Sequence, residues 1–284
     1  MSVAIEWPAP AKLNLFLHVL GRRDDGYHEL QTVFQLLDYG DSLRFDVRRD
    51  GRIQRKPARP IAPEQDLCVR AASLLQEASG TTLGADIALH KRLPMGGGVG
   101  GGSSNAATVL VALNTLWQTG LTEDELAELG LRLGADVPVF VRGRSAWAEG
   151  VGERLAPVSL DSSWFLVLHP GCKISTRQIF CTPELTRNSP SITMSAFRAG
   201  QARNDCEPVV RSLYPEVARA LDWLAGFGQA RLTGTGACLF AEFDDEAQAR
   251  EVLASVPKPW QGFVARGVDE SPLRSRVKAA TAAA

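Results

Sequence analysis

The stretch PMGGGVGGGSSNAA, residues 94–107, has the residue types and spacing that suit the binding of an anion. Six of the seven residues from Gly96 to Gly102 are glycine. Glycine loses more conformational freedom on ordering than any other residue, so such a run needs a physical reason. Without Cβ atoms, successive N–H groups can converge on one group, and a following helix adds its positive dipole end. We expect a phosphate there, with Ser103 and Ser104 donating further hydrogen bonds or touching a phosphate-bound metal.

Other kinds of glycine-rich segment fit less well. A flexible linker would lie between two domains, whereas this run lies between a predicted strand and a predicted amphipathic helix. A Walker A loop would continue with Gly-Lys-Ser/Thr, but Ser103 follows Gly102. The G-x-G-x-x-G pattern of dinucleotide-binding folds occurs at Gly96, Gly98 and Gly101, where so many glycines match it by accident. The His-Arg-Asp and Asp-Phe-Gly motifs of protein kinases are absent.

Two charged residues could take part in phosphoryl transfer. Asp136, in GADVPVF, could be an N-cap or turn residue, or a general base that removes a hydroxyl proton. Lys12 lies on the polar face of the first predicted strand and could be an exposed surface lysine. It could instead keep Asp136 ionised, orient a substrate hydroxyl and offset developing phosphoryl charge. The residues alone leave these alternatives open.

Aromatic residues in two separate segments could hold a planar ring. Tyr27 and His28 follow a tight turn and could be a surface aromatic beside a solvated histidine, or could stack on a pyrimidine and bond its polar edge. Phe180 could belong to the core of a short helix. The segment TGTGAC, residues 233–238, is typical of a hairpin turn, in which Cys238 would be a small packed residue and not a nucleophile.

The elements that position these residues follow from periodicity in the first half of the chain. Leu13, Leu15, Leu17 and Val19 share one face of a strand. Thr122 and Glu125 have the spacing of a capping box, and the following helix is expected to end at Gly134. Further expected elements are strands at LQTVFQLL and SLRFDV, broken at DYGD; a helix at 67–78 ended by Gly80; a strand at 85–90; and a helix that begins near Ser103 or Ser104, either of which could cap it.

In the second half, the pattern predicts strand, helix, strand, strand, helix and strand. The segments are WFLVLHP, a helix at 206–228 interrupted near Pro215, the strand–turn–strand ARLTGTGACLFAEF, a helix at DEAQAREVLASV and the strand QGFVARGV. This order is that of a split βαβ, ferredoxin-like unit. The composition changes within 152–163, which predicts an α+β protein of two domains, residues 1–155 and 156–284.

Composition excludes several classes of protein. The chain has 284 residues, 45% of them apolar and 22% charged, with a net charge of −1. Five cysteines without a Cys-x-x-Cys pair and four histidines without metal-ligand spacing predict a reduced, cytoplasmic protein without structural zinc. No signal peptide and no apolar run of about 18 residues is recognisable. The basic segment Arg48–Arg59 is expected to form a solvated hairpin and loop, with contact to a polyanion as the alternative, and the tail VKAATAAA a frayed helix or disordered end.

Several separated motifs together resemble the GHMP kinases, small-molecule kinases named for galactose, homoserine, mevalonate and phosphomevalonate. The resemblance is carried by PAPAKLNLFLHVLGRRDDGYHELQTVFQLLDYGD, by LPMGGGVGGGSSNAATVLVALN with GADVPVF, by TGTGACLFAEF and by RNDCEPVV. These segments span nearly the whole chain. The resemblance implies a GHMP kinase fold with a ribosomal-protein-S5-like N-terminal domain, which binds ATP, and a ferredoxin-like C-terminal domain, with the site in the cleft between them.

The resemblance also implies roles for individual residues. Asp136 falls at the catalytic aspartate and Lys12 at the conserved lysine. MgATP would contact Pro94, Met95, Gly96, Gly97, Gly98, Val99, Gly100, Gly101, Gly102, Ser103 and Ser104, and TGTGAC would close over the phosphates. Many relatives have asparagine near the adenine where this chain has Asp66, which accepts hydrogen bonds but cannot donate them from an amide. The metal ligands stay unassigned.

The substrate that the resemblance implies is a cytidine diphosphate-linked methylerythritol, phosphorylated on its 2-hydroxyl in the non-mevalonate isoprenoid pathway. Tyr27 and Phe180 would sandwich the cytosine and His28 would bond its edge. Asn14 would contact the substrate hydroxyls, and Thr176 would lie at the ribose or diphosphate.

Two rival functions remain. Another GHMP kinase, acting on mevalonate, homoserine or a sugar, would leave Tyr27, His28 and Phe180 without a nucleobase, and these residues would then not face one cavity. A non-catalytic RNA-binding module would share the N-terminal fold, but the pI of about 6.4 and the lack of a basic stripe count against it. We therefore expect a small-molecule substrate, no nucleic acid or membrane partner, and a monomer or weak homodimer.

Overall fold

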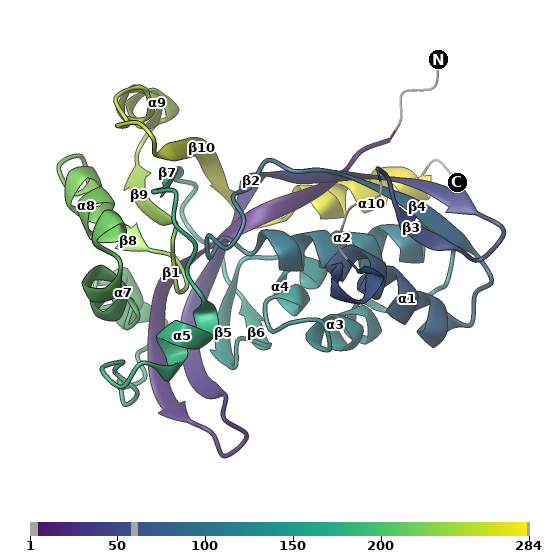
Figure 1. Cartoon of the computed structure of the whole chain (residues 1–284), viewed down its shortest axis with the longest axis horizontal. Helices are drawn as coiled ribbons and strands as arrows, with labels where there is room; N and C mark the ends of the chain where they lie inside the picture. The colour runs from purple at the N-terminus through teal and green to yellow at the C-terminus, as the bar shows by residue number, and fades with distance from the viewer. Residues whose placement is uncertain (1–4, 58–61, 283–284) are drawn as a thin grey trace.

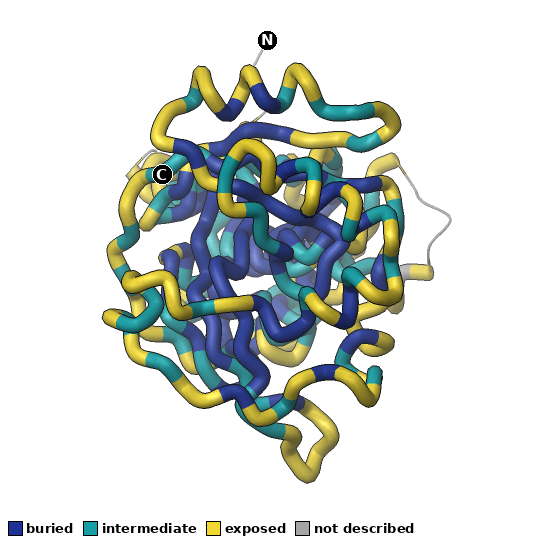
Figure 2. Tube along the Cα trace, turned by 90° about the vertical axis from the view of Figure 1, so that its left-hand side faces the viewer, coloured by how far each residue is buried: buried dark blue, intermediate teal, exposed yellow. Residues whose placement is uncertain are grey.

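A mixed sheet runs through the whole molecule (Figure 1). The computed structural model describes residues 5–57 and 62–282. Two long antiparallel strands, β1 (Trp7–Arg22) and β2 (His28–Arg48), extend across both halves of the chain and are joined by a turn at residues 23–27. Figure 2 shows buried residues along the central strands and exposed residues on the outer turns, so this strand pair lies inside the protein.

The prediction of two strands separated at DYGD is wrong, because β2 continues through that segment. Gly40 and Asp41 stay paired with Pro10 and Ala9 of β1, and the irregularity is a register shift between Pro10 and Lys12. A Cβ atom at Gly40 would lie 2.1 Å from the carbonyl oxygen of Ala9. The glycine therefore permits a close approach of two strands and does not end one of them.

Helices cover one face of the sheet in the first half of the chain (Figure 1). They are α1 (Leu67–Ser79), α2 (Gly101–Leu116), α3 (Glu123–Leu131) and α4 (Val137–Arg142), with the short 3-10 helix η1 (Pro63–Gln65) before α1. The other strands of this half are β3 (Ile53–Arg55), β4 (Gly84–His90), β5 (Ala146–Gly150) and β6 (Arg154–Pro157). Apolar side chains of the helices and the sheet form one core.

Helix ends in this half follow the predicted signals, with one exception. Gly80 ends α1 in the left-handed region, with φ of 67°, and Thr122 and Glu125 form the predicted capping box of α3. The prediction that Gly134 ends α3 is wrong. The helix ends at Leu131 because the N–H groups of Leu133 and Gly134 both donate to the carbonyl oxygen of Gly130, which tightens the last turn.

The second half has the predicted ferredoxin-like order. Its elements are β7 (Trp164–His169), α7 (Glu207–Leu213), α8 (Pro215–Leu224), β8 (Arg231–Leu232), β9 (Leu239–Phe243), α9 (Glu246–Ala254) and β10 (Gln261–Val268), and its strands lie side by side as β10-β7-β9-β8, every pair antiparallel. The predicted interruption at Pro215 separates α7 from α8. Two short helices, α5 (Thr176–Cys181) and α6 (Met194–Arg198), lie in the connection between β7 and α7.

The two halves are joined by backbone pairing. Gly267 and Val268 of β10 pair with β2, so both halves share one continuous sheet. Helix α10 (Pro272–Ala282) then returns to the first half, where Leu273 packs with Trp7 and Ala112. The predicted frayed end is thus helical up to Ala282, and its last two residues lie outside the described part. Strand β6 spans residues 155 and 156, and the division into two domains at that point stays a prediction.

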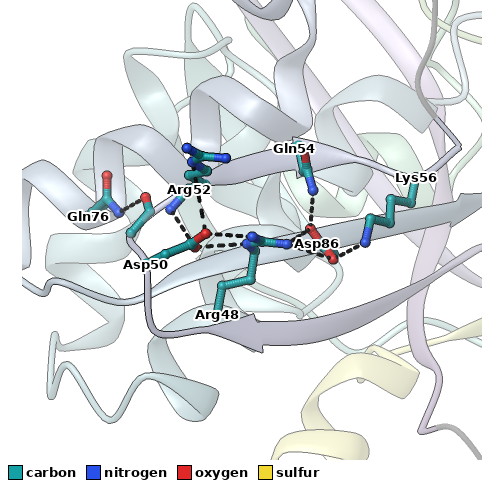
Figure 3. A network of polar contacts seen from close by, with 8 residues as sticks. Arg48, Asp50, Arg52, Gln54, Lys56, Gln76 and Asp86 are labelled. Carbon is teal, nitrogen blue, oxygen red and sulfur yellow. Dashed lines mark hydrogen bonds and ion pairs between the residues drawn. The ribbon is translucent and has the colours of Figure 1, made fainter.

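The basic segment after β2 does not form the predicted hairpin. Strand β3 pairs in parallel with β4 and not with β2. Arg48 contacts Asp50 and Asp86, and Asp86 also contacts Lys56 and accepts a hydrogen bond from Gln54 (Figure 3). Carboxylates thus neutralise these cations. The end of the segment, residues 58 and 59, lies outside the described part of the chain.

Candidate active site

The glycine loop has a backbone conformation that glycine adopts readily. Gly96, Gly98 and Gly100 have φ of 71°, 74° and 72°, in the left-handed region. Helix α2 begins at Gly101, after Gly100 as N-cap, so the prediction that Ser103 or Ser104 caps the helix is wrong. Because Gly101 and Gly102 are already helical, both serines lie in the first turn. The chain thus enters the helix through glycine backbone alone.

Neighbouring segments hold the carbonyl groups of the loop. The carbonyl oxygen of Val99 accepts from the N–H of Lys12 at 3.1 Å, and that of Gly97 accepts from the N–H of Cys238 at 3.0 Å. Among the described residues, no backbone carbonyl accepts a hydrogen bond from the N–H groups of residues 96–103. These donors, together with the positive end of α2, can therefore bind an anion.

Close packing gives a second reason for glycine at three of these positions. A Cβ atom at Gly97 would lie 2.5 Å from Cys238 Sγ, one at Gly98 would lie 2.4 Å from the carbonyl oxygen of Thr233, and one at Gly100 would lie 2.7 Å from the Phe140 ring. TGTGAC thus lies directly against the glycine loop. Cys238 is fully buried, as predicted, and burial raises the pKa of its thiol, which excludes it as a ready nucleophile.

Lys12 and Asp136 form an ion pair beside the loop. Lys12 Nζ lies 3.3 Å from Asp136 Oδ2, and the lysine side chain is 3% exposed whereas that of the aspartate is 33% exposed. Asp136 occupies the N-cap position of α4, but its side chain makes no capping hydrogen bond. Its carboxylate instead contacts Lys12, and the residue lines the same groove as the glycine loop. Of the two alternatives for Asp136, capping by its side chain is therefore excluded.

Asn14 fixes the position of the lysine. Its Oδ1 accepts a hydrogen bond from Lys12 Nζ at 2.5 Å, while its Nδ2 donates to Thr32 Oγ1 at 3.0 Å. The Asn14 N–H donates to Thr233 Oγ1 at 2.9 Å, which links β1 to the second glycine turn. Alternation along β1 puts Lys12 and Asn14 on one face, so a single strand supplies both side chains.

The groove itself has a volume of about 430 Å³ and is lined by the glycine loop, the start of α1 and the end of β4. Asp66 lies in this lining, but its carboxylate is already engaged. It caps α1 by accepting from the N–H of Cys68 at 2.9 Å, and it pairs with Arg55 at 3.1 Å. Both side chains of this ion pair are less than 10% exposed. The Arg55 partner was not predicted, because β3 could not be placed beside α1 from the sequence.

Oxygen atoms in the groove suit a hard cation that is already bound to phosphate. The described residues contain no cluster of three or more His, Cys, Asp or Glu side chains that could hold a metal ion. Asp66 and Asp136 are the carboxylates in the lining. Ser104 Oγ and Asn105 Oδ1 are buried and have no hydrogen-bond partner in the described part of the chain. Mg²⁺ usually needs only one or two protein carboxylates beside phosphate and water, so the donors present fit it.

His28 and Phe180 lie against each other although 152 positions separate them in the chain. Their ring centroids are 4.9 Å apart and the planes differ by 26°. His28 Nε2 accepts a hydrogen bond from Arg187 Nε at 3.2 Å. Burial first, and then the guanidinium groups of Arg187 and Arg22, lower the pKa of His28. Tyr27 is adjacent in the turn between β1 and β2 and is 63% exposed.

Arg187 organises this region and was not among the predicted site residues. Its guanidinium donates to the carbonyl oxygens of Phe180 at 2.8 Å and Thr182 at 2.7 Å, in addition to His28. Phe180 belongs to helix α5, and at the start of that helix Thr176 Oγ1 lies 3.0 Å from Thr235 Oγ1. Helix α5 therefore bridges the start of β2, which carries His28, and the second glycine turn. No sequence signal marked Arg187.

Asn204 and Asp205 are two further residues that sequence reasoning did not single out, although RNDCEPVV was noticed. Asn204 Nδ2 donates to the carbonyl oxygens of Leu232 and Gly234, and thereby holds the second glycine turn. Asp205 Oδ2 accepts from the N–H of Val19 at 2.8 Å. The pair ties β1 to that turn.

Comparison with known proteins gives matches over most of the chain. Residues 66–144 match the GHMP kinases N terminal domain and residues 184–262 match the GHMP kinases C terminal family. A 4-diphosphocytidyl-2-C-methyl-D-erythritol kinase of Alkalilimnicola ehrlichii is 63% identical over 98% of this chain and 96% of the relative.

Solved structures agree with these matches. A crystal structure of 4-(cytidine 5'-diphospho)-2C-methyl-D-erythritol kinase superposes with a TM-score of 0.80 at 34% identity, covering 93% of this chain and 99% of the other. The mevalonate kinase of Methanococcus jannaschii has a TM-score of 0.69 at 17% identity, over 94% and 99% of the two chains, which is likeness of fold alone. No helix in residues 5–57 and 62–282 is long and apolar enough to cross a membrane.

Proposed function

The chain belongs to the GHMP kinases, and we propose that it transfers the γ-phosphoryl group of ATP to the 2-hydroxyl of 4-(cytidine 5'-diphospho)-2C-methyl-D-erythritol. The predicted α+β fold and the predicted family membership are confirmed. The observation that carries the proposal is the placement of the Lys12–Asp136 ion pair beside the glycine loop, in a chain 63% identical to a kinase named for this substrate.

In the proposed reaction, Asp136 removes the proton of the 2-hydroxyl. The hydroxyl oxygen then forms a bond to the γ-phosphorus while the bond from that phosphorus to the bridging oxygen breaks, and the products are ADP and the 2-phosphate of the substrate. Lys12 holds the aspartate in place and offsets negative charge near the reacting group. The free N–H groups of residues 96–103 bind the phosphates, so most of the rate enhancement comes from positioning and electrostatic stabilisation.

Magnesium would enter this site bound to the nucleotide. It would neutralise charge on the β- and γ-phosphates and orient them. Asp136 and Asn105 both line the groove, the Asp136 carboxylate is one-third exposed, and Asn105 Oδ1 has no partner among the described residues. These two side chains are the ones that we assign to the metal and its water ligands.

The region around His28 and Phe180 is the proposed cytosine site. The ring stack and the Arg187 contacts bring together the start of β2 and helix α5, which are distant in sequence. Tyr27 is exposed beside them and would close on the base when substrate binds, while Thr176 would contact the ribose or diphosphate. The contact between His28 and Phe180 favours this substrate over mevalonate, homoserine or a sugar, none of which has an aromatic ring on which these residues could stack.

The decisive assay is ATP-dependent phosphorylation of 4-(cytidine 5'-diphospho)-2C-methyl-D-erythritol, followed by ADP release and product mass. Mevalonate, homoserine and galactose serve as competing substrates, and a salt series with single-stranded RNA tests the binding-module alternative. Turnover of the cytidyl compound alone is expected. Turnover of one of the other three, with none of the cytidyl compound, would contradict the proposal. We further propose a cytoplasmic enzyme that is a monomer or a weak homodimer, which sedimentation across protein concentrations would test.

A further inference from the structure

Lys91 places an ammonium group against the first turn of α2. The residue directly follows β4, and it lines the same groove as the glycine loop. A Cβ atom built at Gly101 would lie 2.9 Å from Lys91 Nζ, which locates the ammonium beside the first residue of the helix. A cation there opposes the positive end of the helix dipole. Stabilisation of α2 therefore does not explain the position of Lys91, whereas a bound anion would.

Asp41 holds this ammonium group in place. Lys91 Nζ lies 2.6 Å from Asp41 Oδ2, and the aspartate side chain has no exposed surface. The other oxygen, Oδ1, accepts from the N–H groups of Arg92 at 2.7 Å and Leu93 at 2.8 Å. One buried carboxylate thus fixes both the lysine head group and the backbone that leads into the glycine loop.

Lys91 keeps donors that Asp41 does not use. An ammonium group has three N–H donors, and one hydrogen bond, to Asp41, is formed within the described part of the chain. The side chain is 23% exposed, so the remaining donors can reach a ligand in the groove. A lysine held in this way loses little conformational freedom when it binds, which favours binding.

Two buried polar atoms near the start of α2 independently indicate a ligand. Ser104 is fully buried and Asn105 is 4% exposed, and neither Ser104 Oγ nor Asn105 Oδ1 has a hydrogen-bond partner among the described residues. Asn105 belongs to the lining of the groove. Unpaired buried polar atoms reduce stability, so a polar ligand in this groove would satisfy Asn105 Oδ1, which the described residues leave unpaired.

We propose that Lys91 binds the phosphate chain of the nucleotide from the side of β4, and that Asp41 is its positioning residue. The inference rests on the proposed function, because it takes the groove to hold a nucleoside triphosphate. The alternative is that the Lys91–Asp41 pair only fixes the turn after β4. The proposal and this alternative make different predictions. Removing the ammonium group of Lys91 from a protein that still folds should weaken phosphate binding under the proposal, but not under the alternative.

The test is calorimetric titration of ADP, adenosine and inorganic tripolyphosphate into the full chain and its variants. K91M removes the ammonium, and K91M/D41N also removes the buried carboxylate, so that a stable fold is obtained even if an unpaired Asp41 unfolds the single variant. The amide oxygen that D41N introduces could still accept from the N–H groups of Arg92 and Leu93. K56M is the matched control, because Lys56 also contacts an aspartate, Asp86, but is not part of the groove lining. Circular dichroism and thermal melts confirm folding.

Loss of a charge-assisted hydrogen bond predicts that K91M and K91M/D41N bind ADP and tripolyphosphate about 10-fold more weakly or worse, with adenosine and the K56M control unchanged. Equal weakening of ADP and adenosine would overturn the phosphate assignment. Unchanged binding of ADP in both folded variants would overturn it too, while leaving the proposed kinase function intact. Failure of the unaltered protein to bind ADP would instead overturn the proposed function, and the inference with it.

Discussion

Lys12 Nζ lies 3.3 Å from Asp136 Oδ2, and this contact joins the first strand of the protein to the start of α4. The lysine is buried and fixed by Asn14, whereas the aspartate is one-third exposed toward the groove. A buried, immobile cation next to an accessible carboxylate suits a base that is held in place for an approaching hydroxyl.

Replacement of Asp136 by asparagine tests this role. D136N keeps the shape of the side chain but removes the proton acceptor, so we expect kcat to fall by about 10²–10⁴-fold, the usual contribution of a general base. Steady-state kinetics with both substrates measures the effect. D124N is the matched control, because Asp124 is an exposed aspartate paired with Arg142 on α3 and α4. A fall in kcat below tenfold would contradict the assignment of Asp136 as base.

Alanine substitutions in the glycine loop distinguish the effect of backbone strain from the effect of close packing. Gly96 and Gly98 both have φ near +70°, so either substitution would cost about 1–2 kcal/mol of stability from strain alone. A Cβ atom at Gly96 meets nothing within 4 Å, but at Gly98 it would lie 2.4 Å from the carbonyl oxygen of Thr233. We therefore expect G98A to displace the loop from the second glycine turn and to weaken ADP binding far more than G96A. Urea unfolding and ADP titration of both variants measure the difference. Equal ADP affinity would show that contact with Thr233 does not shape the loop.

Local patterns in the sequence predicted most of the elements that position the site. Alternation placed Lys12 and Asn14 on one face of a strand, and the residue order of the second half identified its ferredoxin-like topology. These features depend on short-range periodicity, which can be recognised in a single sequence. The glycine loop was also recognisable, because so dense a run of glycine between a strand and a helix indicates close approach of the backbone to a ligand or to a neighbouring segment.

The predictions that failed depended on contacts between distant segments. Gly40 was taken as a strand break because its pairing partner, Pro10, lies 30 positions away. The cap of α2 was assigned to serine because the local sequence does not show that Gly100 has a left-handed φ or that a side chain there would meet the Phe140 ring, 40 positions away. Arg187 and Asn204 went unnoticed for the same reason, since their roles consist of hydrogen bonds to remote backbone groups.

Phe180 provides a test of the cytosine site that leaves the phosphate site untouched. In F180L the aromatic ring is lost while an apolar side chain remains to pack at the end of α5. Stacking on a nucleobase contributes about 1–3 kcal/mol, so we expect KM for the cytidyl substrate to rise about tenfold and KM for ATP to stay constant. F227L is the control, because Phe227 is an exposed phenylalanine beyond α8. An equal rise in both KM values would point to general loosening of the fold.

The lowered pKa of His28 predicts how the free energy of unfolding depends on pH. Its pKa in the folded protein lies below the ordinary value of 6.5, chiefly because of burial and then because of Arg187 and Arg22. Between these two values the unfolded chain binds a proton that the folded chain does not. The free energy of unfolding therefore falls as the pH drops below about 6.5, and this loss is complete once the pH is below the folded-state pKa.

The variant H28Q removes this contribution, so its unfolding free energy should fall less than that of the unaltered protein between pH 7.5 and pH 5. His18 and His169 have lowered pKa values of the same sign, caused first by burial, and remain in both proteins. The comparison therefore isolates His28. H90Q, which alters an exposed histidine at the end of β4, is the control for the replacement of a histidine by glutamine as such. Urea unfolding at several pH values measures these differences. A steeper decline in H28Q than in the unaltered protein would mean that His28 is protonated in the folded state, with its hydrogen bond from Arg187 lost.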